Sequence, residues 1–314
     1  MLEVHPELRQ AANWIPKFSF SRKNLWWLRF LTGLMRGPGT PKWLVIENTF
    51  IRGKNAGAQI RLRLYRPKAA PSPAPVLLWM HGGGYLIGQP ELDDLRCIRY
   101  AQALGLVIVS VDYRLAPEHP FPAPLDDCYS ALEWVVAQAH RLAIDPKRLA
   151  IGGESAGGGL AAALAQLAHD RKAINPVFQL LVYPMLDDRT VIRTDIVNHG
   201  RPLWTQDSNR FGWESYLGKK AGADDVPDYA VPARREDLSG LPPAWIGVGT
   251  LDLFHDEDVA YAQRLQAAGV ECELNVVPGA FHGFDVFSGK AQVVEDFLRA
   301  QVAALAKQLR PVTT

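Results

Sequence analysis

Cysteine is scarce in this chain of 314 residues, which holds three: Cys97, Cys128 and Cys272. They are isolated in the sequence, and an odd number of isolated cysteines forms neither a disulfide framework nor a zinc-type cluster. The role expected of these thiols is buried packing. We therefore predict a reducing compartment, the cytoplasm, and no metal site.

Long apolar runs are also missing. No stretch approaches the ~18 apolar residues that a membrane span requires. The first 20 residues mix Glu3, Glu7, Arg9 and Lys17 with apolar positions, and so lack the apolar core of a signal peptide. The expectation is a soluble intracellular protein without a membrane span.

The chain has no excess of charge of either sign. Its 34 basic and 33 acidic residues give a net charge of +1, and no block of like charge occurs. This balance predicts neither a nucleic-acid surface nor an acidic tail. A chain of this length can bury the core of one large α/β domain with an added subdomain.

What the sequence does contain is an alternation of strands and helices. Residues 44–50 and 59–65 have an apolar period of two and predict an antiparallel pair. The short apolar runs that follow alternate with helical stretches, which predicts a mostly parallel sheet covered by helices. Reactive groups of such a sheet gather beyond the carboxyl ends of its strands. The runs are residues 76–80, 106–111, 149–151, 178–183, 244–248 and 274–277.

Ser155 stands in the centre of a Gly-Glu-Ser-Ala-Gly segment, residues 153–157, between an apolar run and an Ala-rich helical stretch. This is the strand–turn–helix pattern G-x-S-x-G, which exposes a nucleophilic serine at a sharp bend. Glycine at both ends allows the tight turn and leaves the hydroxyl uncrowded. Alone, the segment also fits a Gly-rich turn in which Ser155 is an ordinary helix N-cap.

A second motif, His-Gly-Gly-Gly at residues 81–84, follows the apolar run 76–80. Three consecutive glycines leave backbone N–H groups free to point at an anion, as an oxyanion hole requires. A phosphate loop of the Walker type would end in Gly-Lys-Ser/Thr, and none is present. The two motifs in this order predict acyl-transfer chemistry.

Four motifs together are similar to those of the hormone-sensitive-lipase-like esterases, bacterial family IV, and the resemblance covers roughly residues 45–310. It implies an α/β-hydrolase fold with a helical cap, an ester substrate and no cofactor, and it leaves a homodimer open. The motifs are His-Gly-Gly-Gly at 81–84, Tyr-Arg-Leu-Ala-Pro-Glu at 113–118, Gly-Glu-Ser-Ala-Gly-Gly at 153–158 and His-Gly-Phe at 282–284.

The same resemblance divides the chain into a core and a cap. Between residues 184 and 232 the strand–helix alternation lapses and aromatic residues cluster, where the family inserts part of its cap. Residues 24–35 form an amphipathic stretch, which we expect in the cap; a membrane-surface helix is the alternative. The expected parts are 1–43, N-terminal part of the cap; 44–186, first part of the core; 187–231, cap insertion; and 232–314, second part of the core.

A nucleophilic serine needs a base, and the base needs an acid that holds it in the correct tautomer. In this fold the chain order is Ser, then Asp or Glu, then His. His282 follows the last apolar run and a Pro-Gly-Ala loop, which is the position expected of the base. The other downstream histidines fit less well: His169 on the helix after the serine, His199 in the cap region, and His255.

Asp252 is the predicted acid because it follows the apolar run 244–248 across a three-residue loop. The family usually has Asp-Pro-Leu here, whereas this chain has Asp-Leu-Phe. Asp256 and Asp258 are the alternatives, but we expect them to begin the next helix, where acids are common. The predicted triad is therefore Ser155, Asp252 and His282.

The complete prediction is a serine carboxylesterase that acts on short- to medium-chain acyl esters through an acyl-enzyme. A receptor on the same scaffold would lack the catalytic histidine, and an amidase or peptidase remains the other alternative. Glu154 and the loop 113–118 are expected to brace the site. The expected oxyanion donors are the N–H groups of Gly83, Gly84 and Ala156, and the expected substrate contacts are Tyr85, Leu203, Trp204 and Phe211.

Overall fold

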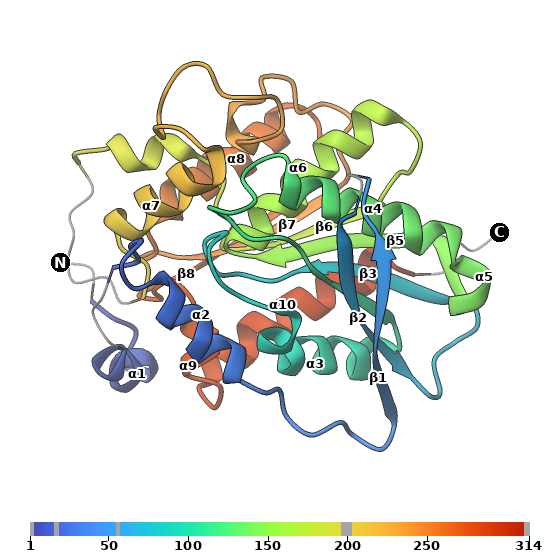
Figure 1. Ribbon diagram of the computed structural model, residues 1–314. Helices are drawn as coiled ribbons and strands as arrows, with labels where there is room; N and C mark the ends of the chain where they lie inside the picture. The colour runs from blue at the N-terminus through green and yellow to red at the C-terminus, as the bar shows by residue number, and fades with distance from the viewer. Residues whose placement is uncertain (1–2, 16–18, 55–56, 196–202, 311–314) are drawn as a thin grey trace.

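The computed structural model describes the chain except residues 1–2, 16–18, 55–56, 196–202 and 311–314. A central sheet of eight strands has the order β1-β2-β4-β3-β5-β6-β7-β8 (Figure 1). The strands β1 and β2 pair antiparallel, β2 pairs antiparallel with β4, and every later pair is parallel. The predicted mostly parallel sheet with an antiparallel pair at its start is confirmed.

The strands match the apolar runs of the sequence within a few residues. All seven residues of β3 are buried, since helices cover this strand on both faces. The strand β5 begins at Ile144, earlier than predicted, because Ile144 pairs with Ala74 beyond a register shift in β3. The bounds are β1 Leu44–Arg52, β2 Gln59–Pro67, β3 Ala74–Met80, β4 Val107–Asp112, β5 Ile144–Glu154, β6 Phe178–Val182, β7 Ala244–Gly249 and β8 Cys272–Val277.

Helices cover both faces of the sheet, with α3 and α10 on one face and α4, α6 and α8 on the other (Figure 1). The helix α6 is buried over most of its length because its Ala-rich surface packs closely against β3, β5 and β6. The bounds are α1 Arg9–Trp14, α2 Leu25–Leu34, α3 Asp94–Leu104, α4 Ala123–Ala137, α5 Ala139–Leu142, α6 Ala156–Arg171, α7 Gln206–Leu217, α8 His255–Ala267, α9 Phe284–Phe287 and α10 Gln292–Gln308.

Two apolar cores lie on the opposite faces of the sheet. Successive residues of a strand point to opposite faces. Accordingly Leu78 of β3 belongs to the core that contains Leu160 of α6, whereas its neighbour Trp79 belongs to the core that contains Phe297 of α10. This arrangement explains why the inner strands are continuous apolar runs in the sequence rather than alternating patterns.

The two segments expected in the cap meet each other in the structure. The hydroxyls of Ser19 and Thr205 lie 2.9 Å apart, and the backbone N–H of Phe20 donates to the Ser208 hydroxyl at 3.0 Å. The rings of Phe20 and Trp204 lie 5.3 Å apart between centroids. The N-terminal segment and the chain around the start of α7 therefore pack as neighbours, although about 185 residues separate them in the sequence.

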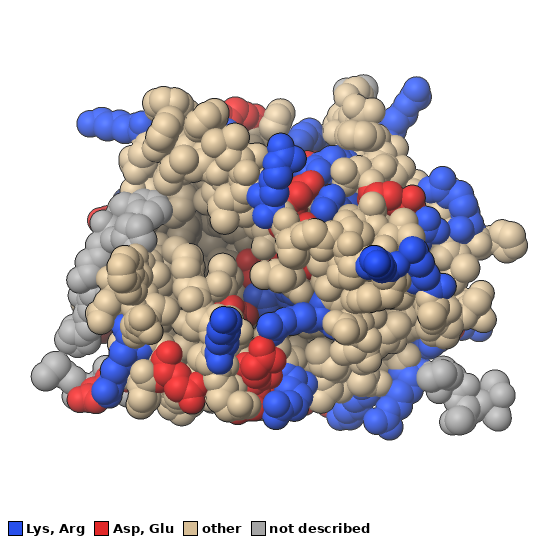
Figure 2. All heavy atoms as spheres, turned by 90° about the horizontal axis from the view of Figure 1, so that it is seen from below, with Lys and Arg blue, Asp and Glu red and all other residues tan. Residues whose placement is uncertain are grey.

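The surface seen from below carries both basic and acidic side chains, and a hollow opens among residues that are mainly of neither kind (Figure 2). Within the described residues, none of the helices has both the length and the apolar character needed to cross a membrane.

Candidate active site

Ser155 lies at the sharp turn between β5 and α6. Its backbone has φ 53° and ψ −122°, a strained conformation that residues with side chains rarely adopt. A side chain at position 157 could not be accommodated, since its Cβ would lie 2.2 Å from the carbonyl oxygen of Met80 and 2.4 Å from that of His81. The turn predicted from the glycine spacing thus presents the serine at the carboxyl edge of the sheet.

His282 lies between Ser155 and Asp252. Its Nε2 is 2.9 Å from the Ser155 hydroxyl, and its Nδ1 is 2.8 Å from Oδ2 of Asp252. The other oxygen of Asp252 accepts a hydrogen bond from the backbone N–H of Phe254 at 2.9 Å. All three side chains are buried, with Ser155 5%, Asp252 1% and His282 6% exposed. The structure brings the three predicted residues together in one hydrogen-bonded chain.

Aromatic rings surround the imidazole of His282. The rings of Tyr183 and Phe254 meet it edge to face at centroid distances of 4.9 and 5.1 Å, and Trp204 lies 6.5 Å away. Such packing fixes the ring plane and excludes water from the hydrogen bond to the carboxylate. Sequence reasoning missed Tyr183 and Phe254, because neither stands in a motif that marks it as a neighbour of the histidine.

The alternative acids and bases lie elsewhere. Asp256 is exposed, and its carboxylate bonds the Nδ1 of His255 at 2.8 Å and Arg193 at 2.8 Å. His169 lies near the end of α6, beside Gly240. Asp258 is buried in α8 at 0% exposure. The negative charge of Asp252 is one of the causes that raise the pKa of Asp258. The remaining alternative, His199, lies outside the described residues.

The glycines of the His-Gly-Gly-Gly motif have backbone conformations that side chains disfavour. Gly83 has φ 119° and Gly84 has φ 62°. Among the described residues, the N–H groups of Gly83, Gly84 and Ala156 are not donors in any backbone hydrogen bond outside the helices and strands. Ala156 is the first residue of α6, where the helix dipole adds positive potential. These three positions have the properties that an oxyanion hole needs.

Trp204 and Leu203, two of the expected substrate contacts, lie beside the His-Gly-Gly-Gly loop and His282 respectively. A Cβ at Gly84 would lie 2.0 Å from Cη2 of Trp204, so the indole ring rests directly on this glycine. A Cβ at Gly283, next to His282 in the sequence, would lie 2.7 Å from a methyl group of Leu203. The Trp204 side chain is 4% exposed, and its Nε1 donates to Asn209 at 3.2 Å.

Tyr85 and Phe211, the other two expected substrate contacts, pack differently. The ring of Tyr85 is 1% exposed and stacks on Tyr216 at 4.0 Å between centroids. Its φ of 63° turns the side chain into the core, where its hydroxyl lies over Gly159 of α6. Phe211 of α7 is half-buried against the same core. Both residues pack within the protein, and their contact with substrate stays a prediction.

A buried ionic network joins the loops of the serine and the histidine. Arg96 of α3 bonds the carboxylates of Glu154 at 2.6 Å and Asp285 at 2.9 Å. The Tyr183 hydroxyl donates to Asp285 at 2.7 Å, while its ring contacts His282. Burial works against the charged guanidinium, but Asp285, Tyr183 and Glu154 raise the pKa of Arg96 well above its ordinary value. The bracing role expected of Glu154 is thus confirmed, through a partner that the sequence did not suggest.

The loop after β4 braces the start of the His-Gly-Gly-Gly motif, as expected. The Tyr113 hydroxyl donates to the His81 carbonyl at 2.7 Å, and the two rings stack at 4.2 Å. Burial lowers the pKa of His81, so this imidazole is neutral. Arg114 and Asp127 form an ion pair at 2.8 Å, which attaches the loop to α4.

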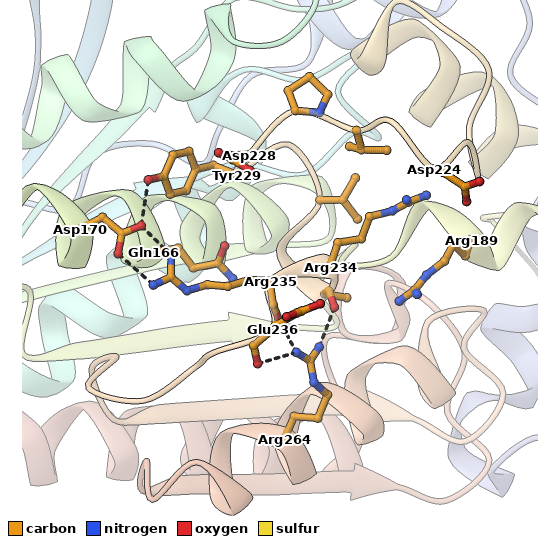
Figure 3. Close-up of a pocket in the computed structure, with 14 residues that line it drawn as sticks. Gln166, Asp170, Arg189, Asp224, Asp228, Tyr229, Arg234, Arg235, Glu236 and Arg264 are labelled. Carbon is orange, nitrogen blue, oxygen red and sulfur yellow. Dashed lines mark hydrogen bonds and ion pairs between the residues drawn. The ribbon is translucent and has the colours of Figure 1, made fainter.

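A separate cavity of about 850 Å³ is lined by none of Ser155, Asp252 and His282 (Figure 3). Its arginines point at partners within the protein: Arg235 meets Asp170, and Arg264 donates to backbone carbonyls, among them that of Ala233. The described residues contain no group of three His, Cys, Asp or Glu side chains that could hold a metal ion.

Comparison with known proteins agrees with this geometry. The profile of a family described as the alpha/beta hydrolase fold matches residues 77–286, about two thirds of the chain. The chain belongs to the α/β-hydrolase family. The matched region includes Gly83, Gly84, Ser155, Asp252 and His282.

Relatives of this α/β-hydrolase are named as esterases. The carboxylesterase NlhH of Mycobacterium tuberculosis is 36% identical over 274 residues, which cover 86% of this chain and 84% of that protein. The ethyl acetate hydrolase of Pseudomonas putida is 35% identical over 259 residues, which cover 81% and 80%. A solved bacterial heroin esterase is 38% identical and superposes with a TM-score of 0.92 over 98% of both chains. The predicted fold, family and enzyme class are thereby confirmed.

Proposed function

We propose that this hydrolase cleaves short- to medium-chain acyl esters through a Ser-His-Asp triad and an acyl-enzyme intermediate. The observation that carries the proposal is the hydrogen-bonded chain from Asp252 through His282 to Ser155, with distances of 2.8 and 2.9 Å. Both are within the reach of direct proton transfer between a serine, a base and its orienting acid.

The first step is attack of the Ser155 oxygen on the ester carbonyl carbon. His282 accepts the serine proton at Nε2, and Asp252 stabilises the imidazolium through Nδ1. The carbonyl oxygen becomes an oxyanion, which accepts hydrogen bonds from the N–H groups of Gly83, Gly84 and Ala156. As the tetrahedral intermediate collapses, the imidazolium returns the proton to the leaving alcohol and the acyl group stays on the serine.

The second step is hydrolysis of the acyl-enzyme. A water molecule gives its proton to His282 and attacks the acyl carbon, forming a second oxyanion at the same backbone donors. Collapse of this intermediate breaks the bond to Ser155, whose oxygen recovers the proton from the imidazolium. The carboxylic acid leaves, and the enzyme is restored without a cofactor.

The substrate pocket is proposed to lie under a cap formed by residues 1–43 and 187–231. The hydrogen bonds and ring contact between Phe20 and the start of α7 support a single cap made from both segments. Trp204 rests on the oxyanion glycine Gly84, so its indole is the side chain we assign to the acyl pocket. The three cysteines are free thiols, which is consistent with the proposed cytoplasmic location.

The test is turnover of p-nitrophenyl acetate and butyrate by Ser155→Ala and a matched control. We expect Ser155→Ala to lose about 10⁴-fold or more in kcat, because removal of a triad nucleophile has effects of this order. Ser130→Ala is the control: it is also a buried serine, but its hydroxyl bonds a backbone carbonyl within α4. An active Ser155→Ala protein, or a parent that binds esters without turnover, would contradict the proposal.

A further inference from the structure

The helix α2 lies on the outside of the molecule (Figure 1). It exposes several large apolar side chains. We call this the outer face of α2. Residues three, four and seven positions apart share one side of a helix, so these side chains form one stripe. The outer face consists of Trp26, Trp27, Phe30, Leu31 and Leu34, which are 67%, 46%, 53%, 43% and 62% exposed.

The orientation of this helix is determined by its inner side. Leu25 is 5% exposed and belongs to the core. Arg29 reaches inward, where it donates to the carbonyl of Leu86 at 2.8 Å and forms an ion pair with Glu118 at 2.8 Å. A helix whose arginine points inward while tryptophans point outward has the reverse of the pattern expected at a water-exposed surface. The exposure of the apolar residues therefore follows from how α2 is attached.

The outer face is also organised within itself. The rings of Trp26 and Trp27 meet at 5.5 Å, and those of Trp27 and Phe30 stack at 5.4 Å. A contiguous exposed patch of this kind on a single helix marks an interaction surface, whereas scattered apolar residues do not.

Along the sequence, the residues around the outer face carry charge of one sign. From residue 8 to residue 46 the sequence contains no Asp or Glu and seven basic residues, although the whole chain is almost neutral. An aromatic helix face with flanking Lys and Arg is the composition of a helix that lies in the interface of an anionic membrane. The basic residues are Arg9, Lys17, Arg22, Lys23, Arg29, Arg36 and Lys42.

A second copy of the chain fits this surface less well. In a two-fold contact the same patch meets itself, so each basic residue must find a partner on an identical surface. The segment around α2 offers no carboxylate for Arg22, Lys23 or Arg36, and the neighbouring Glu118 already pairs with Arg29. Apposed like charges disfavour such a contact, whereas anionic lipid headgroups would neutralise them.

We infer that the outer face of α2 binds anionic lipid surfaces, with its aromatic side chains inserted at headgroup level and its basic neighbours on the lipid phosphates. With ten residues, α2 is far too short to span a bilayer, so the binding is peripheral. The inference concerns association of the protein with a membrane surface, and it does not depend on the proposed ester hydrolysis.

The experiment is co-sedimentation of the full chain with two kinds of vesicle. One is an anionic mixture of phosphatidylglycerol and phosphatidylcholine, and the other is neutral phosphatidylcholine alone. We expect binding to the anionic vesicles that weakens with salt, and at least tenfold weaker binding to the neutral ones. The combined variant Trp26→Ser, Phe30→Ser, Leu34→Ser should bind anionic vesicles at least tenfold more weakly than the parent. These side chains are exposed, so its melting temperature should stay near that of the parent.

The matched control is Trp14→Ser, which removes a tryptophan that is 81% exposed on α1 and lies off the outer face. It should bind anionic vesicles like the parent. Equal losses in the control and the triple variant would overturn the inference, as would a parent that ignores anionic vesicles at low salt. A parent dimer that the triple variant converts to a monomer would assign the outer face to contact between copies instead.

Discussion

Arg96 is the only described cation that bonds both Glu154, next to the proposed nucleophile, and Asp285, in the turn after the proposed base. It is 8% exposed, and Asp285 is buried as well. Removal of one partner from a buried ion pair leaves an uncompensated charge, which costs far more than the pair contributes when intact. The position of the catalytic loops therefore depends on a residue that takes no part in the proposed chemistry.

Arg96→Met should destabilise the fold by about 3–5 kcal/mol and lower kcat, because two carboxylates lose their counter-charge behind the triad. The added substitution Asp285→Asn should restore part of both losses, since it removes one of the stranded charges. Urea unfolding and ester kinetics on the single and double variants measure this.

Arg99→Met is the matched control for Arg96. Arg99 lies in the same helix and forms an ion pair with Glu295, with 3.0 Å between Nη1 and Oε1. The two side chains are 40% and 43% exposed. Exposed ion pairs contribute about 1 kcal/mol or less. A stability loss as large as that of Arg96→Met would show that the helix, and not the buried network, is responsible.

Asp258 is a second buried residue whose charge state matters. Within the described part of the chain, neither of its carboxyl oxygens has a hydrogen-bond partner, and the side chain is 0% exposed. Burial, with smaller contributions from Glu257 and Asp252, raises the pKa of Asp258 well above its ordinary value. The folded protein therefore holds this carboxyl in its neutral form.

Asp258→Asn should stabilise the protein at high pH. Because the folded-state pKa is raised, the contribution of Asp258 to stability is complete below the ordinary aspartate pKa of about 4 and is lost as the pH rises towards the folded value. The asparagine amide of the variant does not titrate, so it adds no pH dependence to the stability. Urea unfolding should give the variant a larger free energy of unfolding than the parent at pH 8, with the difference shrinking towards pH 4.

Asp256→Asn, two residues away, should change the free energy of unfolding with the opposite dependence on pH. Hydrogen bonding to His255, and to a lesser degree the ion pair with Arg193, lowers the pKa of Asp256. Its contribution is therefore present above the ordinary aspartate pKa and lost in acid, so this variant should be less stable than the parent near neutrality. If the stability difference from the parent changed with pH in the same way for both variants, the burial of Asp258 would not be the cause of the effect of Asp258→Asn.

Among the elements, the turn from β5 into α6 has the tightest steric demand. Gly157 occupies the first turn of α6, and any side chain there would meet the carbonyls of Met80 and His81. Those carbonyls belong to the end of β3 and the start of the oxyanion motif. The close approach of α6 to this loop is what brings Ser155 and the expected oxyanion donors together.

Gly157→Ala should force α6 and the oxyanion loop apart, with a loss of both stability and turnover. In contrast, Gly33→Ala, also within a helix, has nothing within 4 Å of the added methyl group and should be neutral or stabilising by up to ~1 kcal/mol. Thermal melts and ester kinetics on both variants separate steric conflict from helix propensity. Normal activity in Gly157→Ala would contradict the packing argument.

For the whole molecule, the packing of the expected cap segments against the core determines the shape of the proposed acyl pocket. Trp204 of the second segment contacts Phe20 of the first and rests on Gly84 of the core. Each acyl methylene that fits an apolar pocket adds about 0.8 kcal/mol, so kcat/KM should rise with chain length and then fall once the pocket is full.

Trp204→Ala should move the maximum of that profile to longer acyl chains, because it removes the ring that closes the space above the oxyanion glycine. The measurement is kcat/KM for acetyl to palmitoyl p-nitrophenyl esters. Trp134→Ala is the control, since it also removes a tryptophan that packs on the core, but one that lies on α4 against Arg141. A maximum that stays at the parent's chain length would remove Trp204 from the acyl pocket.

The sequence alone predicted the order of most strands and helices, and it named the three residues that the structure brings into one hydrogen-bonded chain and that we propose as the triad. The reason is that these features depend on local chemistry: apolar runs make buried strands, and glycine spacing makes the turns that present Ser155 and the oxyanion glycines. Asp252 and His282 could be chosen because each follows directly after a strand, at the edge of the sheet where the serine also lies.

Only the tertiary structure revealed the partners that come from distant parts of the chain. Arg96 meets Glu154 across 58 residues and Asp285 across 189, and no local pattern marks these residues as neighbours. The inward turn of Tyr85 depends on its positive φ, and the outward face of α2 depends on the inward contacts of Arg29. Pairings of this kind are decided by how the helices pack on the sheet, because many packings are compatible with the same local sequence preferences.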